Sequence, residues 1–300
     1  MKVLVTGATG FIGGRLTARL IEAGFEVRCL VRDRRRAAHL EAAGCELHEG
    51  DVLDAESLSG AGRDVGVAYY LVHSMGRGDS GDYAARDREA ARNFARMAAA
   101  ESVGRVIYLG GLGNDAGSKH LRSRHEVAEV LAAEGPPLTY FRAAMVVGAG
   151  SESYRTLRYL VSRLPVMVAP AWLRTPTQPI GVEDVLDYLT DAPAVAASTG
   201  REVQIGGPDV ITYADMLGEM AAALGTYRRP MVPVPLLTPT LSSLWIGLVT
   251  PVDAGVARPL VQGLSTKTVV EDPSGMALFD ISPAPFRETL RQALAEDTDG

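Results

Sequence analysis

Short apolar runs alternate with amphipathic stretches along the first half of the chain. The apolar runs predict strands at 3–5, 26–31, 46–48, 67–72, 105–109 and 138–147. Between them, apolar positions recur at helical spacing and predict helices at 11–23, 35–43, 82–102 and 121–133. Near-continuous apolar strands that alternate with helices indicate a parallel sheet covered on both faces. Right-handed crossovers then give an α/β fold with a doubly wound sheet, in which ligands bind at the carboxyl ends of the strands.

The regular alternation ends after about residue 148. We predict helices at 151–163, 183–189 and 213–224 and a strand at 203–205. Seven prolines between residues 230 and 273 predict a segment of loops and short helices. We therefore expect a doubly wound domain in residues 1–150. Residues 151–300 should form a smaller lobe for a substrate or partner, with some strands returning to the main sheet.

The first predicted strand and helix are joined by a turn with glycines at positions 7, 10 and 13. Gly7 permits the tight turn, Gly10 lets a phosphate approach the backbone, and Gly13 lets the helix pack close to the strand. The N-terminus of this helix presents free N–H groups and the positive end of the helix dipole, which suit a pyrophosphate. An ordinary glycine-rich turn is the alternative, but the flanking strand and helix are the context that a dinucleotide site requires.

Arg32 follows the second strand, where NAD sites carry an acid for the ribose 2′-hydroxyl and an arginine suits the 2′-phosphate of NADP. Asp33 comes next and could turn inward instead. The arginines at 34–36 make NADP(H) the favoured cofactor over NAD(H), because planar guanidinium groups match phosphate well. The alternative is that this basic cluster is the solvated start of a helix.

Composition narrows the function classes. The net charge is −6 and the pI about 5.5, and no basic stretch carries interleaved aromatics, which argues against a nucleic-acid partner. Cys29 and Cys45 lack metal-ligand spacing, so we expect two reduced, buried thiols and no metal.

The chain enters a strand directly, so we expect no signal peptide and a cytoplasmic protein. The apolar stretch 241–249 is too short to span a bilayer; it could lie on a membrane, cover a pocket or, in the simplest case, form a buried helix.

Residues 6–13, TGATGFIG, resemble the TGxxGxxG signature of extended and atypical short-chain dehydrogenase/reductases. Further matching motifs are GDV at 50–52, YYLVHSM at 69–75, RAAMVVG at 142–148, QPIGVEDV at 178–185 and IGGP at 205–208. Together they cover about residues 1–225. The chain is similar to the NAD(P)-binding proteins grouped with the NmrA-like regulators and with the NADPH-binding accessory subunit of respiratory complex I.

The resemblance implies a Rossmann domain that binds NAD(P) and a homodimer that pairs the two long helices. In the adenine-contacting turn, Asp51 would accept from the adenine amino group and Val52 would pack on the ring, although Asp51 could also be a helix N-cap or turn residue. The cofactor contacts then comprise Gly7, Thr9, Gly10, Phe11, Ile12, Gly13, Arg32, Asp51, Val52, Leu71, Val72, His73, Gly110 and Arg142.

The catalytic motif of the family is absent. Catalytic members carry Tyr-x-x-x-Lys on the helix after the fifth strand, and here His120 and Arg124 occupy those positions. The usual serine falls in the stretch 110–113, GGLG. His120, with an ordinary pKa of ~6.5, could donate a proton, and Arg124 could hold a ribose or an anionic substrate. The alternative is two surface residues. His73, after the fourth strand, could relay a proton or be an ordinary loop residue.

Two functions remain open. The first is an atypical NADPH-dependent reductase of a small activated carbonyl, quinone or enone, in which positioning and electrostatics carry the reaction without a tyrosine. Apolar Met145, Met167, Trp172 and Trp245 would then line a pocket, unless they are core residues. The second is a non-catalytic NADP(H) sensor or assembly protein, which the missing motif favours. The expected partners are the dinucleotide and a small-molecule ligand, with no nucleic acid and no integral membrane segment.

Overall fold

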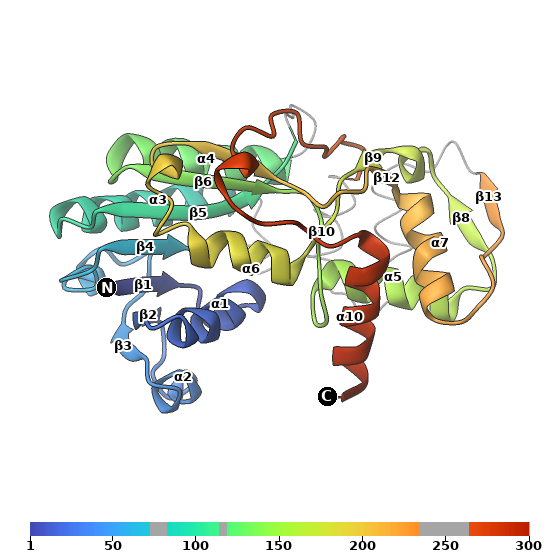
Figure 1. The fold of residues 1–300 in the computed structure, drawn as a ribbon. Coiled ribbons are helices and arrows are strands. Elements are labelled where there is room, and N and C mark those ends of the chain that lie inside the picture. The colour runs from blue at the N-terminus through green and yellow to red at the C-terminus, as the bar shows by residue number, and fades with distance from the viewer. Residues whose placement is uncertain (73–82, 114–118, 234–263, 300) are drawn as a thin grey trace.

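The computed structural model describes residues 1–72, 83–113, 119–233 and 264–299. Seven parallel strands form the central sheet in the order β11-β6-β5-β4-β1-β2-β3 (Figure 1). They are β1 (Lys2–Thr6), β2 (Glu26–Val31), β3 (Glu46–Glu49), β4 (Val67–Tyr70), β5 (Arg105–Gly111), β6 (Leu138–Ala143) and β11 (Glu202–Ile205). The strand order reverses between β1 and β4, which is where doubly wound sheets bind ligands. The predicted fold class is confirmed.

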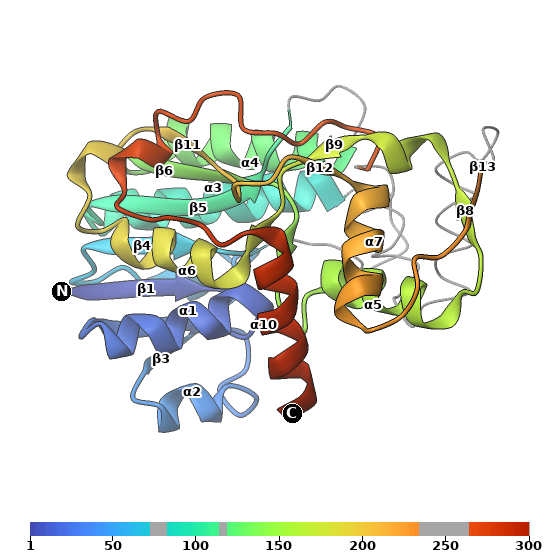
Figure 2. The ribbon, with the colours of Figure 1, turned by 45° about the vertical axis from the view of Figure 1, so that its right-hand side comes forward.

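Helices cover both faces of the sheet, and the alternation of side chains along each strand explains why. Val3 and Val5 of β1 pack into a core with α1 (Phe11–Glu22), α2 (Ala38–Ala42) and α6 (Val182–Asp191), which Figure 2 shows in front of the sheet. Leu4 points to the opposite face and packs with η1 (Glu56–Leu58), α3 (Tyr83–Ala100) and α4 (Lys119–Glu134). Because successive side chains of a strand alternate, both faces are apolar and both need cover.

A third core forms beside the carboxyl ends of the strands. It packs α5 (Glu152–Arg163), α7 (Tyr213–Ala223) and α10 (Phe286–Asp299) around Tyr154, Leu157 and Met216. Three two-stranded pairs frame it: β7 (Val146–Val147) with β10 (Ile180–Gly181), β9 (Pro176–Thr177) with β12 (Ile211–Thr212), and β8 (Met167–Ala169) with β13 (Met231–Pro233). The short helices are η2 (Ala171–Arg174), η3 (Ala196–Ser198) and η4 (Met276–Leu278).

Parts of the second half of the chain return to the first. β11 joins the edge of the main sheet in register with β6, with Val203 beside Phe141. α6 packs on α1, where Arg19 forms ion pairs with Glu183 and Asp187. A strand therefore returns from the C-terminal half to the sheet, as expected. The division of the chain near residue 150 stays a prediction.

Two predicted elements differ from the structure. The run 138–147, predicted as one strand, is broken after Ala143, because Val146 leaves the sheet to pair with Ile180 of β10. The helix predicted at 35–43 shortens to α2 because Asp33 holds the preceding residues in a turn. Cys29 and Cys45 are free and buried as predicted, and burial raises the pKa of both thiols. Within the described ranges, no helix has the length and apolar character needed to cross a membrane.

Candidate functional site

The glycine turn lies between β1 and α1, next to the start of the loop that follows β4. Gly7 has a φ of +86°, and a Cβ added there would lie 2.8 Å from the carbonyl oxygen of Leu71. A Cβ on Gly13 would overlap the carbonyl oxygen of Gly7. Both positions therefore require glycine, one for its backbone conformation and one for the close approach of α1 to the end of β1. These are the roles that the sequence predicted.

The first turn of α1 is open to a ligand. Gly10 is the N-cap residue, no side chain caps the helix, and no acidic residue stands in its first turn. The N–H groups in the first turn of an α-helix have no intrahelical partner, so those after Gly10 are available as donors. Together with the positive end of the helix dipole they fit a pyrophosphate. Phe11 and Ile12, also predicted to contact the cofactor, are half-buried at this turn, and Thr9 is exposed.

The charged residues that follow β2 differ in whether they already have a partner in the structure. The Asp33 carboxylate accepts from the backbone N–H groups of Arg35, at 2.9 Å, and Arg36, at 3.4 Å. Arg34 is paired with Glu41 at 2.8 Å. Arg32 is exposed and has no hydrogen bond or ion pair within the part of the chain that the structure describes. Among the described residues, Arg32, Arg35 and Arg36 are thus cations without a side-chain partner at this corner, while the carboxylate of Asp33 is held by its own turn.

Asp51 and Val52 lie at the carboxyl end of β3. One carboxylate oxygen of Asp51 accepts from the backbone N–H of Leu53 at 3.0 Å, which makes Asp51 a turn residue. The other oxygen has no hydrogen bond within the described ranges, so the turn role leaves an acceptor for an adenine amino group. Val52 and Val72 are half-buried against the same core, on the face of α3 and α4. Leu71 packs against the opposite core.

The end of β5 is filled by side chains from neighbouring elements. A Cβ on Gly110 would lie 2.7 Å from the ring of Tyr140, and one on Gly111 would lie 2.6 Å from Leu121. Tyr140 itself stacks on Tyr108, with ring centroids 5.3 Å apart and planes at 15°. The glycines therefore make room for a packed aromatic pair, and a serine side chain at Gly110 has no space.

His120 and Arg124 lie on α4 above this end of the sheet. Burial, together with the Arg124 charge, lowers the pKa of His120 from 6.5 to about 3. Arg124 donates to the carbonyl oxygen of Leu109 at 3.3 Å, and its buried Nε has no hydrogen-bond partner among the residues that the structure describes. Tyr108 donates to the backbone oxygen of Arg124 at 3.4 Å. This environment argues against the predicted acid role, because His120 is neutral near pH 7 and carries no imidazolium proton to give.

The remaining candidates from the sequence either lie outside the described residues or pack in the third core. His73 and Trp245 lie outside the described residues. Trp172 and Met167 are buried in the third core, where Trp172 meets Tyr213 edge to face at 6.1 Å, and Met145 packs against the same cluster. They are core residues, the alternative that the sequence left open. Among the described residues, no group of three or more His, Cys, Asp or Glu side chains could hold a metal ion.

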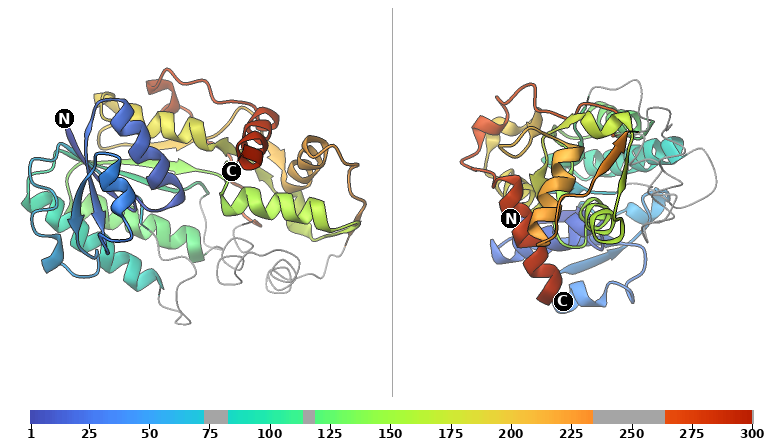
Figure 3. Two further views of the ribbon diagram at one scale, coloured as in Figure 1. Left: turned by 90° about the horizontal axis from the view of Figure 1, so that it is seen from below. Right: turned by 90° about the vertical axis from the view of Figure 1, so that its right-hand side faces the viewer.

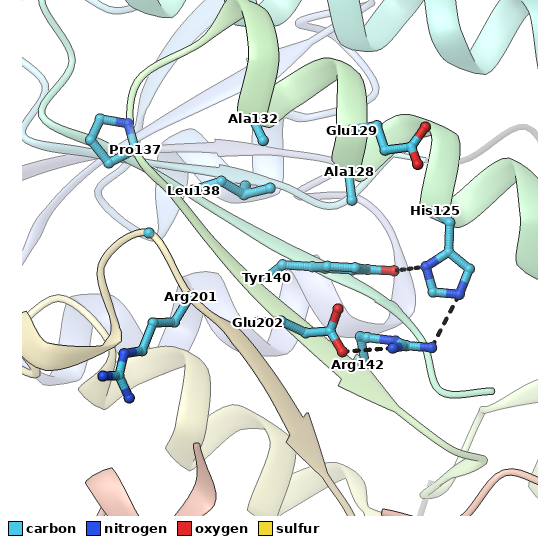
Figure 4. A pocket seen from close by; sticks show the side chains of 11 residues that line it. His125, Ala128, Glu129, Ala132, Pro137, Leu138, Tyr140, Arg142, Arg201 and Glu202 are labelled. Atoms are coloured by element: carbon cyan, nitrogen blue, oxygen red, sulfur yellow. Dashed lines mark hydrogen bonds and ion pairs between the residues drawn. The ribbon is translucent and has the colours of Figure 1, made fainter. Parts of the chain in front are cut away.

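Arg142 lies in an open pocket beside the edge strand β11 (Figure 4). Its strand, β6, is separated from β1 and the glycine turn by β5 and β4. The pocket has a volume of about 710 Å³ and is lined by His125, Ala128, Glu129, Ala132, Pro137, Leu138, Tyr140, Arg142, Gly200, Arg201 and Glu202. The Arg142 guanidinium pairs with Glu202 at 2.6 Å and donates to the carbonyl oxygens of Gly111, at 3.3 Å, and Gly113, at 2.8 Å. These bonds fix the end of β5, so its placement does not support the predicted cofactor contact.

His125 completes this network. Its Nε2 lies 3.0 Å from the carbonyl oxygen of Gly113, and its Nδ1 lies 3.3 Å from the Tyr140 hydroxyl. Nε2 also lies 3.1 Å from Nη2 of Arg142 (Figure 4). A proton on Nε2 satisfies the contacts with Gly113 and Tyr140 but leaves no acceptor for Arg142, whereas a proton on Nδ1 lets Nε2 accept from Arg142 and loses the bond to Gly113. The sequence analysis missed this cluster. Tyr140 and Arg142 are two residues apart on β6, so the sequence could have placed them on one face of that strand. Glu202 comes close to them only because β11 pairs with β6, and no local pattern predicts this pairing.

Comparison with known proteins agrees with this geometry. Residues 7–148 match a family model described as NAD(P)H-binding. The crystal structure of an NADPH-dependent quinone oxidoreductase from Escherichia coli, complexed with NADPH, matches with a TM-score of 0.75 at 16% identity, over 96% of this chain and 98% of that one. Citrobacter sp. triphenylmethane reductase complexed with NADP(H) matches with a TM-score of 0.73 at 16% identity, over 98% and 100%. At such identities the likeness shows the fold.

Curated relatives match over shorter stretches. The photosystem II assembly factor Ycf39 of Cyanophora paradoxa is 45% identical over 58 residues, 19% of this chain and 18% of the relative. An uncharacterized protein of Mycobacterium tuberculosis is 25% identical over 234 residues, 78% of this chain and 24% of the relative. The chain thus spans less than a quarter of the length of these two relatives. The NAD(P)H-binding family model thus matches residues 7–148, just under half of the chain, and the solved structures share the fold of nearly the whole chain.

Proposed function

We propose that the protein is an NADPH-dependent reductase of small activated acceptors such as quinones, enones and other conjugated carbonyls. The observation that carries the proposal is the contrast between a glycine turn whose helix begins without a side-chain cap and the presence of His120 and Arg124 where the family keeps its tyrosine and lysine. A chain that binds a dinucleotide without a poised proton donor is suited to acceptors whose hydride adduct is a stabilised anion, since such adducts form without a general acid.

The preference for NADP(H) rests on Arg32. It follows β2 directly and has no hydrogen bond or ion pair in the described part of the chain, and the carboxylate of its neighbour Asp33 is held by the following turn. Arg35 and Arg36 are exposed next to it. A free guanidinium at this corner can form charge-assisted hydrogen bonds to the 2′-phosphate that NAD lacks.

Bound NADPH supplies a hydride, which is two electrons and one proton, and the second proton of the reduction comes from solvent water. Arg124 supplies a fixed positive charge at the end of β5, anchored by its bond to Leu109, and its Nε has no partner within the described ranges. A preorganised cation at this edge stabilises negative charge that develops on an acceptor oxygen. The printed descriptions of the quinone oxidoreductase and the triphenylmethane reductase support this acceptor class by analogy of fold alone.

The test is NADPH oxidation, followed at 340 nm, with 2-methyl-1,4-naphthoquinone and with cyclohexenone, set beside NADP⁺ reduction with 2-propanol. We expect turnover of at least one activated acceptor and little or no oxidation of the alcohol. Arg124→Gln should lower the turnover, whereas the control Arg122→Gln, an exposed position on the same helix, should not. Brisk alcohol oxidation would contradict the proposal.

A second function is a non-catalytic NADP(H) sensor or assembly protein. The absence of the tyrosine and lysine favours it, and the match to an assembly factor over 58 residues is in keeping with it. Tight NADPH binding without turnover of either acceptor would support this function instead. We further propose a homodimer through α3 and α4, which sedimentation equilibrium would test.

A further inference from the structure

Among the residues that the structure describes, three arginines of the central sheet are buried, and each donates to carbonyl oxygens of the backbone. They are Arg28 of β2, Arg105 of β5 and Arg142 of β6. Arg28 donates to the backbone of residues 60–63, which lead into β4, and Arg105 to that of residues 192–195, which precede β11. Both contacts lie near the starts of strands. Arg142 differs, because it binds backbone at the carboxyl end of β5, the end of a parallel sheet at which ligands bind.

The carbonyl oxygen of Gly113, just beyond β5, lies within hydrogen-bond distance of two side chains. Nη2 of Arg142 donates to it at 2.8 Å, and Nε2 of His125 lies 3.0 Å away. Gly113 has a φ of +123°, which favours glycine, and a Cβ added there would lie 3.2 Å from Leu121 of α4. Nε of the same guanidinium donates to the oxygen of Gly111 at 3.3 Å. The backbone at the end of β5 is therefore held by contacts from both α4 and β6.

β5 extends beyond its last pairing with β4, and two guanidinium groups bind the extended part. The carbonyl oxygen of Leu109 accepts from Arg124 at 3.3 Å. Those of Gly111 and Gly113 accept from Arg142. Arg124 reaches this stretch from α4, which lies on the face of the sheet opposite α1 and α6 (Figure 3). Because both arginines are bonded to one short stretch of backbone, a displacement of that stretch would also move the anchor of Arg124.

The charge of Arg142 is balanced from the edge strand. Glu202 of β11 accepts from Nη1 of Arg142 at 2.6 Å and from the side-chain amide of Gln204 at 3.3 Å. The Glu202 side chain is 44% exposed, whereas that of Arg142 is 5% exposed. A guanidinium at such depth requires a partner, because an unpaired charge is strongly unfavourable in the interior. The edge strand therefore helps to determine where this guanidinium lies and, through it, where the end of β5 lies.

We propose that Arg142 is a positioning residue for the reductase reaction. With Glu202 and His125 it would hold the end of β5 so that Arg124 faces the acceptor, an inference that rests on the proposed function. Arg142 would act without touching either reactant, since β5 and β4 separate its strand from the glycine turn. Hydride transfer depends steeply on alignment, and a displacement of about 1 Å can lower the rate about a hundredfold. The expected signature is a lower kcat at an unchanged affinity for NADPH.

The test is the double variant Arg142→Met with Glu202→Leu, which removes the ion pair without leaving an unpaired buried charge. NADPH oxidation with 2-methyl-1,4-naphthoquinone at saturating NADPH should show kcat lowered about ten- to a hundredfold. Calorimetry should show unchanged NADPH affinity. Arg142→Lys keeps the charge and can still donate to a backbone carbonyl, so its kcat should lie between those of the double variant and the unmutated protein. It also serves as the second variant if the double variant does not fold.

The matched control is Arg28→Met with Glu46→Leu. Arg28 is buried to a similar degree, pairs with Glu46 at 2.9 Å and donates to backbone carbonyls, but it binds backbone near the start of β4. We expect this variant to keep its kcat, and urea unfolding of both double variants separates losses of stability from losses of rate. Equal kcat losses in the two, or a loss of NADPH affinity as large as the loss of rate, would overturn the positioning role.

Two further outcomes separate this inference from the function on which it rests. If the unmutated protein binds NADPH but turns over no acceptor, the proposed function fails and the positioning role of Arg142 fails with it. If the unmutated protein turns over the quinone and both Arg142 variants keep its kcat, the positioning role alone is overturned.

Discussion

Two strand–helix units of the same sheet, β1–α1 and β5–α4, differ in what they leave available. After β1, glycines keep the turn free of side chains, and α1 begins without a side-chain cap. After β5, the glycines have the opposite role. Gly110 and Gly111 make room for the side chains of Tyr140 and Leu121, which fill the space beside the turn. The same residue type thus keeps one turn free of side chains and, in the other, makes room for side chains of neighbouring elements.

The difference separates binding from proton transfer. The first unit offers backbone donors that bind a pyrophosphate whatever reaction follows. In the second unit, Arg124 is anchored to the backbone and His120 is held neutral by burial. On the proposed function, dinucleotide binding and the acid catalysis of the family would therefore depend on separate strand–helix units of one sheet, so that a sequence could keep the first without the second. Four experiments test this separation, in order of decreasing expected effect.

The largest effect is expected from Gly13→Ala. The new methyl group would overlap the carbonyl oxygen of Gly7, and neither backbone can move without separating α1 from β1. We expect a loss of about 3 kcal/mol in the free energy of unfolding, measured in urea. Gly14→Ala is the matched control, because its Cβ would lie 3.4 Å from the Ala8 oxygen; it should be neutral or stabilising by up to ~1 kcal/mol. Equal effects of the two changes would show that α1 does not pack as described.

Gly10→Val should remove dinucleotide binding while the protein stays folded. A Cβ there meets only the Gly7 oxygen, at 3.2 Å, so the protein itself can accommodate it, but the branched side chain would occupy the pyrophosphate space. Calorimetry should show NADPH affinity reduced by about a hundredfold or more, which corresponds to ~2.7 kcal/mol. An unchanged affinity in a folded variant would place the phosphate site elsewhere.

Arg32→Ala should weaken NADPH binding about ten- to a hundredfold and leave NADH binding nearly unchanged, since a charge-assisted hydrogen bond contributes ~1.5–3 kcal/mol. Arg34→Ala is the control, because Arg34 is already paired with Glu41. If calorimetry gave the unmutated protein equal affinities for the two cofactors, Arg32 would have no part in selecting between them.

The smallest effect concerns His120. Its pKa is lowered to about 3 in the folded protein from ~6.5 in the unfolded chain, so the unfolded state takes up the proton first as the pH falls. The stability that neutral His120 contributes is complete above pH 6.5 and is lost progressively toward pH 3. Between pH 7.5 and 5.5 the loss should be about 1 kcal/mol, and His120→Gln should lack this part of the pH dependence in urea unfolding.

The same variant also tests catalysis. A residue that is neutral and does not donate a proton should change the reductase rate by less than about tenfold when replaced. A loss of 10²–10⁴-fold at pH 7 would instead restore His120 as a general acid.

The local pattern of the sequence predicted the first unit well and the second poorly, for a physical reason. Gly7 and Gly13 act on backbone a few residues away, so their roles follow from nearby sequence. The packing of Tyr140 over Gly110 and the pairing of Arg142 with Glu202 join segments from different strands. The low pKa of His120 depends on burial, which no spacing of residues reveals. The predicted fold class held because each strand and helix carries its own periodicity.

β11 follows its sheet neighbour β6 only after a long stretch of sequence, which has a consequence for synthesis on the ribosome. β6 ends at Ala143 and its outer neighbour begins only at Glu202, so an emerging chain carries an unpaired strand edge until that point is translated. Exposed edges of this kind promote association between nascent chains. Truncation between the two strands would also leave the buried Arg142 guanidinium without its carboxylate. The nucleotide-binding half is therefore a poor candidate for expression alone, and a minimal fragment should extend at least through Ile205.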